Sequence, residues 1–227
     1  MIKFILSLVL TLFLAISSAF SAPCYGTKMP QANQYFSGFQ THLLLERDLE
    51  AEYGSLRSAQ NFLGFSYGFF DWLTIDLKIG VGNLKQHPVD SDEVDYNSSF
   101  AGGYGVRFKL YDNQKKRLVF GFHHISVHPY SIDLDGIENR SILDDWQVSM
   151  LASYSFSKVT PYLGTKWSRV DYIHWVDDQR KRRMSDLTKG VGLVLGLDIP
   201  LSDRTWLNLE GQLFDGKALA SSLNISF

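Results

Sequence analysis

The chain has 227 residues, of which 20% are charged and 14% aromatic, and its formal net charge is -2. A balance this close to neutral excludes a protein that binds nucleic acid through a strongly basic surface. After residue 21 no continuous apolar stretch approaches the ~18 residues expected of a membrane-spanning helix, which excludes a helical membrane protein.

The first segment is typical of a secretory signal peptide. Lys3 precedes an apolar run over residues 4–16, and small residues follow it. The run is too short to anchor the chain, and no basic stop-transfer flank follows, so we expect it to be removed. Cleavage after Ser21 places small side chains at both recognition positions, with cleavage after Ala19 as the alternative. Cys24 is the single cysteine, so an internal disulfide is excluded.

From residue 39 onward, apolar and polar residues alternate in ten segments. A period of two places successive side chains on opposite faces of a β-strand. In chain order the segments are residues 39–46, 63–69, 73–79, 103–110, 118–123, 146–156, 162–175, 190–199, 205–214 and 218–227. Two are irregular, because Leu44 falls on the polar face of the first, and both faces mix around Arg169 and Asp171. The irregularities predict a β-bulge or a strand end beyond the apolar zone.

The connections between these segments alternate between short and long. The short set is residues 68–71, 112–116, 157–160 and 200–204. The long, more charged set is residues 47–57, 82–97, 127–144 and 176–187, with residues 215–217 as a short exception. An even number of strands lets both ends of the chain lie on the side of the short turns.

The last segment carries the most regular alternation and ends on an aromatic residue. Leu219, Leu223, Ile225 and Phe227 share one face, and small or polar residues occupy the other. In this the chain resembles the small bacterial outer-membrane β-barrel superfamily, which includes porin-like barrels and whose last strand ends on an aromatic residue read by the barrel-assembly machinery. Phe227 matches that assembly signal.

The resemblance implies an all-β fold, a closed antiparallel up-and-down transmembrane barrel of about ten strands in the bacterial outer membrane. Its expected partners are outer-membrane lipid, lipopolysaccharide and the barrel-assembly machinery, with no nucleic acid, no metal and no cofactor. The expected division is a signal peptide over residues 1–21, a periplasmic segment over 22–34 and the barrel over 35–227. The sequence leaves open whether residues 22–34 instead enter the lumen.

A ten-stranded barrel is too narrow for a wide water channel, so its inward side chains should fill it. The inward positions carry both charge signs, and we expect a paired network in the lumen. The predicted members are Glu46, Asp76, Lys78, Arg107, Lys109, Lys166, Asp198 and Glu210. A narrow porin-like channel is the alternative interpretation.

One short motif suggests an enzyme. His124 and Ser126 fall on the lipid-facing side of their strand, and a serine beside a histidine can attack an acyl ester. The pair resembles the His-x-Ser pair of the outer-membrane lipid A deacylases, which work with a nearby Glu, and Glu138 is the candidate here. Those enzymes are shorter eight-stranded barrels with the pair near the C-terminus and an Asn after the Ser, where this chain has Val127. The alternative is that His124 lies in the interfacial belt of amphipathic rings.

A second resemblance, to omptin-like proteases, fails on strand geometry. Asp90 and Asp92 match the first acidic pair of those ten-stranded enzymes. Asp171 and His174 are an odd number of residues apart, so they point to opposite faces of a strand.

Two further clusters complete the candidates. Of His123, His124 and His128, at most two can converge, so no metal site is predicted. A basic run falls in a predicted surface loop and could clamp lipopolysaccharide phosphates. Its members are Arg180, Lys181, Arg182 and Arg183. The favoured function is therefore a structural or surface-interaction role carried by extracellular loops, with a deacylase-like esterase as the enzymatic alternative.

Overall fold

The computed structural model describes residues 23–50 and 53–227. The predicted signal peptide over residues 1–21 lies outside the described residues. Within those ranges, no helix is long and apolar enough to cross a membrane.

Among the described residues, twelve antiparallel strands form one sheet. In chain order the strands are β1 (Tyr35–Asp48), β2 (Ser55–Phe70), β3 (Leu73–His87), β4 (Val94–Asp112), β5 (Lys116–Val127), β6 (Ile132–Leu134), β7 (Ile137–Tyr154), β8 (Thr160–Val176), β9 (Gln179–Met184), β10 (Val191–Pro200), β11 (Thr205–Leu213) and β12 (Lys217–Ser226). A 3-10 turn, η2 (Leu187–Lys189), precedes β10.

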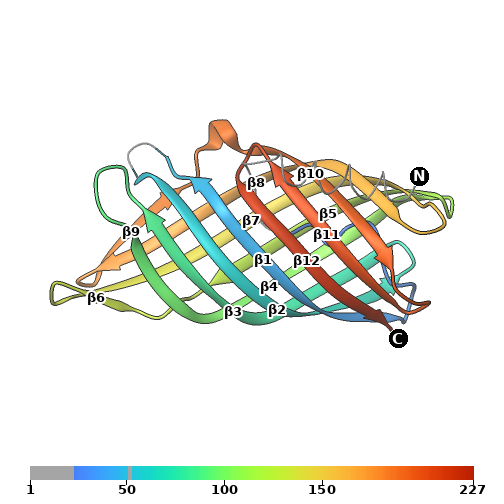
Figure 1. Ribbon diagram of the computed structural model, residues 1–227, viewed down its shortest axis with the longest axis horizontal. Helices are drawn as coiled ribbons and strands as arrows, with labels where there is room; N and C mark the ends of the chain where they lie inside the picture. The colour runs from blue at the N-terminus through green and yellow to red at the C-terminus, as the bar shows by residue number, and fades with distance from the viewer. Residues whose placement is uncertain (1–22, 51–52) are drawn as a thin grey trace.

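Ten of these strands close into a ring. The order runs β7, β5, β4, β3, β2, β1, β12, β11, β10 and β8, and a further pairing of β7 with β8 completes the circle. Two short strands pair with ring strands beyond the ring itself: β6 pairs with β7, and β9 pairs with β8 (Figure 1). Each predicted segment lies on one ring strand, so the prediction of a closed up-and-down barrel of ten strands is confirmed.

The strands are longer than the sequence pattern indicates. β4, β7 and β8 contain 19, 18 and 17 residues, whereas a tilted transmembrane strand needs about 9–11. Much of the predicted long loops is therefore strand, because the alternation of oily and polar residues is lost where water wets both faces. The short strands β6 and β9 lie at the end opposite to the C-terminus and the short turns (Figure 1). We take the end with the short turns as periplasmic.

The outward face of the ring is a belt of exposed apolar side chains. Leu63, Ile79 and Val191 are 64%, 60% and 64% exposed, and many neighbours on other strands are similar. Aromatic rings line the periplasmic edge, where Phe70 stacks on Trp72 and Tyr35 stacks on Phe227. A continuous apolar surface of this extent is stable only against lipid, because soluble proteins expose patches of a few hundred Å² at most.

Candidate functional site

An ion pair between two fully desolvated side chains lies at the centre of the periplasmic half of the lumen. Arg107 on β4 donates to both carboxylate oxygens of Asp76 on β3, with Nε to Oδ2 at 2.7 Å and Nη2 to Oδ1 at 2.8 Å. The Ser66 hydroxyl donates to the same carboxylate at 2.5 Å, and His123 Nε2 lies 3.6 Å from it. The bidentate pair joins β3 to β4, and the Ser66 hydroxyl joins β2 to the same carboxylate.

A second polar group joins the strands on the other side of the ring. Lys166 lies 2.8 Å from Asp215 and donates to Gln212 at 2.7 Å. Arg47 lies 3.3 Å from the same Asp215 carboxylate, and its guanidinium also donates to the Asp215 and Ser168 carbonyls. Asp215 comes from the short connection between β11 and β12, so this turn is held inside the barrel mouth.

Two of the eight predicted network residues lie elsewhere. Glu46 is part-exposed and binds Lys217, and Lys109 lies at the periplasmic edge, 3.4 Å from Asp112. The Glu46 prediction is wrong about the direction of the side chain because β1 has a bulge between Leu44 and Glu46. The bulge turns Arg47 inward in place of Glu46, and Leu44 on the polar face was the only irregularity in the pattern that pointed to it.

The other predicted members do line the lumen. Lys78 donates to Gln40 at 2.9 Å, and Asn208 donates to Asp198 at 2.8 Å. Glu210 accepts from the Tyr162 hydroxyl at 2.8 Å and from Gln212. Small inward residues make the space for these long side chains: a Cβ on Gly196 would overlap the Tyr162 ring. The periplasmic half of the lumen is therefore filled by interlocked polar side chains.

The extracellular half of the lumen has a different character. Buried apolar side chains meet there and form a core like that of a soluble protein. Its buried members are Leu44, Leu49, Leu56, Phe62, Leu84, Tyr96, Ala101, Ile125, Val127, Leu143, Val170, Tyr172 and Ala218. We call this cluster the apolar layer. It was not predicted.

The segment before β1 occupies the polar half of the lumen. Cys24 and Thr27 are buried, the Cys24 N–H donates to Glu210 at 2.7 Å, and the Thr27 hydroxyl donates to Ser153 at 2.7 Å. Residues 30–34 remain at the periplasmic end, where Asn33 N–H donates to the Gly68 carbonyl. Of the two placements left open, residues 23–29 therefore lie in the lumen, not in the periplasm.

On the outer wall, Ser126 lies among polar side chains of β5 and β7. Its oxygen is 2.8 Å from Nε2 of His128, and its hydroxyl donates to Asp144 at 2.5 Å. His124 Nε2 is 3.6 Å from Asp144, and its ring lies 3.9 Å from that of Trp146. His124 thus lies against the aromatic rings of the belt.

Glu138 is not part of this cluster. Ser126 pairs in register with Asp144 on β7. Glu138 lies six residues before Asp144 on the same strand, which at strand spacing is roughly 20 Å from Asp144. The structure therefore brings Ser126 together with His128 and Asp144, and not with the predicted Glu138.

The basic run forms β9, not a loop, so its four side chains divide between two faces. Arg180 and Arg182 face outward: Arg180 lies 5.8 Å from the Trp175 ring, and Arg182 donates to Asp171 at 2.5 Å. Arg183 lies over the Tyr53 ring at 3.9 Å, on the side of the barrel mouth. Alternation along the strand gives Lys181 the face of Arg183.

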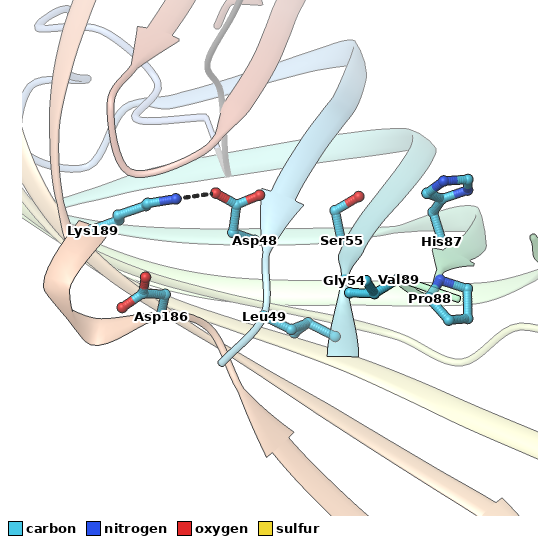
Figure 2. A pocket seen from close by; sticks show the side chains of 9 residues that line it. All are labelled: Asp48, Leu49, Gly54, Ser55, His87, Pro88, Val89, Asp186 and Lys189. Carbon is cyan, nitrogen blue, oxygen red and sulfur yellow. Dashed lines mark hydrogen bonds and ion pairs between the residues drawn. The ribbon is translucent and has the colours of Figure 1, made fainter. Parts of the chain in front are cut away.

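A polar pocket of about 560 Å³ opens at the extracellular mouth (Figure 2). It lies between the ends of β1, β2 and β3 and the η2 turn, and Lys189 there binds Asp48 at 2.6 Å. The hydrogen bond from Lys189 to Asp48 raises the pKa of Lys189. Contacts from the Thr188 hydroxyl and N–H lower the pKa of Asp186.

No known protein family and no curated protein matches the chain. Among solved structures it is similar to the transport unit of the autotransporter AIDA-I from Escherichia coli (12% identity, 97% of each chain, TM-score 0.49) and to an outer membrane channel from Pseudomonas putida F1 (9% identity, 92% of this chain and 100% of that one, TM-score 0.48). It is also similar to Ail, the attachment invasion locus protein of Yersinia pestis (9% identity, 88% of this chain and 100% of that one, TM-score 0.44). Likenesses of this size carry no argument about activity. By its own architecture, a closed antiparallel ring with an apolar outer belt and a polar lumen, the chain is an outer-membrane β-barrel.

Proposed function

We propose that this barrel does not conduct and serves to hold a surface-binding arm at the outer face of the membrane. The proposal that the barrel does not conduct rests on the apolar layer, whose side chains pack in the extracellular half of the lumen. Ions do not cross a packed apolar core, because a charge loses its hydration there at a cost of several kcal/mol. Buried polar side chains fill the other half and also flank the apolar layer, as Arg47 and Asp215 do.

The arm consists of β6, β9 and the extracellular parts of β7 and β8. Arg140, Trp175 and Arg180 are register partners on three adjacent strands, so they form one row on one face. Arg169 and Arg182 both bind Asp171 on the same outer wall. Arginines directly above an apolar belt suit the phosphate groups of the outer-leaflet glycolipid, which they can bind in a bidentate manner.

Conductance tests the closed lumen. In planar bilayers the inserted protein should give no channel steps, with insertion verified by resistance of the barrel to protease. Regular steps from the wild-type protein would show that the apolar layer is not a seal and would favour the narrow channel.

Lipopolysaccharide binding tests the arm. Arg180→Gln should weaken binding of the detergent-solubilised barrel about tenfold, the equivalent of ~1.4 kcal/mol, and dephosphorylated lipopolysaccharide should bind equally weakly to both proteins. Arg183→Gln is the matched control, because this arginine on the same strand faces the mouth. Equal losses for the two variants would contradict the proposed outward face.

A second candidate function rests on the contacts of Ser126. A serine hydroxyl against a histidine and an aspartate at the lipid interface has the components of an acyl-ester hydrolase. The arrangement is the less favoured one, since Asp144 accepts directly from Ser126 instead of orienting His128. Lipid A from cells with the intact protein should match that from cells with Ser126→Ala. Loss of an acyl chain that depends on Ser126 would establish the esterase.

A further inference from the structure

The luminal segment is recognised through its backbone. Arg107 donates to the Lys28 carbonyl at 2.8 Å and to the Tyr25 carbonyl at 3.4 Å, while Glu210 accepts the Cys24 N–H. Gln147 donates to the Pro23 carbonyl at 3.3 Å. Three polar side chains of the barrel wall, from three different strands, thus bind four backbone groups of the segment, as in a receptor for a peptide ligand.

The wall also selects two residues of the segment, Tyr25 and Gly26. The Tyr25 ring lies under Lys78 Nζ at 4.1 Å and 4.7 Å from the His123 ring, a cationic and aromatic slot. Gly26 has φ of +66°, and a Cβ there would lie 3.1 Å from Asn208 Nδ2. The slot therefore requires an aromatic residue followed by glycine in a tight turn.

The apolar layer does not include this segment. Residues 23–29 form no strand pairing, and the apolar layer contains none of them. The contacts of the segment include many hydrogen bonds and cation–π interactions, which water can replace. Its apolar contacts include a small cluster of Cys24 with Leu151, Tyr162 and Val194, and Met29 is also buried.

We propose that the polar half of the lumen is a peptide-binding site open to the periplasm, and that residues 23–29 are its tethered, detachable occupant. The site takes a short peptide that contains an aromatic–glycine turn. Withdrawal of the segment leaves the apolar layer in place, so it exposes a receptor pocket without opening a channel.

Exchange of the segment tests this proposal in the folded barrel. A protease cleavage sequence inserted between Ala32 and Asn33, where the chain is exposed, allows the segment to be cut after folding. The cut segment should stay bound through gel filtration under reducing conditions. It should then be displaced by a labelled synthetic peptide of residues 23–31, while heat-modifiable migration shows that the barrel remains folded.

Peptide variants separate specific recognition from simple trapping. The Tyr25 hydroxyl has no hydrogen-bond partner among the described residues, so the Tyr25→Phe peptide should exchange as well as the native one. Tyr25→Ala and Gly26→Val peptides should compete at least tenfold less well. A barrel that lacks residues 23–29, where it folds, should bind the same peptides in the same order. The proposal would be overturned if none of the four peptides entered a folded, cut barrel. It would also be overturned if all four exchanged equally well.

Discussion

The pair of Asp76 and Arg107 allows a quantitative test of the filled lumen. Both side chains are buried, at 0% and 2% exposure, and they share two hydrogen bonds. Asp76→Asn keeps the shape of the side chain but leaves the guanidinium charge without its counter-ion. Breaking one partner of a buried pair costs ~3–5 kcal/mol. Arg107 keeps the carbonyls of Tyr25 and Lys28 as acceptors, so we expect the lower bound, ~3 kcal/mol.

The assay is equilibrium unfolding in guanidinium chloride from detergent micelles, followed by tryptophan fluorescence and extrapolated linearly. The double variant Asp76→Asn with Arg107→Met should lose less free energy of unfolding than the sum of the two single variants, because neither charge is then left buried alone. Lys109→Ala is the control, since its pair with Asp112 lies at the part-exposed edge and should contribute less than ~1 kcal/mol. Additive losses, or a loss for Asp76→Asn no larger than for Lys109→Ala, would refute the argument from burial.

Three further outcomes follow from individual contacts. Gly196→Val should prevent formation of a heat-modifiable barrel in refolding gels, because the side chain would overlap the Tyr162 ring. Deletion of Phe227 should lower the amount of barrel assembled in cells, measured in membrane fractions, since it removes the terminal aromatic ring stacked on Tyr35. Asp48→Asn should lower the pKa of Lys189, measured by NMR titration, because its main interaction partner loses its charge, while the free energy of unfolding changes by less than ~1 kcal/mol.

The strand pattern could be predicted where lipid touches the wall, and only there. Between residues 63 and 79 every second side chain must be oily, so alternation marks β2 and β3 and their turn correctly. Beyond the belt, β9 has no apolar face at all, and its sequence Gln179–Met184 is compatible with a loop. Pairing with β8, a contact invisible in a local window, makes it a strand.

The contents of the lumen were harder to derive than its wall. In a regular strand, alternation correctly identifies Asp76 and Arg107 as inward residues. In β1, however, one extra residue at the bulge places Arg47 at the inward position expected for Glu46. The partner of Ser126 on the outer wall was missed for a related reason. Periodicity gives the face of Ser126, whereas only the register between β5 and β7 brings Asp144, eighteen residues later, beside it.

The closed lumen and the peptide-binding site are proposed for different halves of the lumen, so the two proposals can be tested separately. The apolar layer is built from ring strands and the adjoining Leu49, with no residue of the luminal segment, so its packing persists when residues 23–29 leave. The polar half loses its occupant and fills with water from the periplasmic side. An ion entering from that side would still meet a packed apolar core. Release of the segment alone should therefore produce peptide binding without conductance, whereas in a gated pore the same release would produce both.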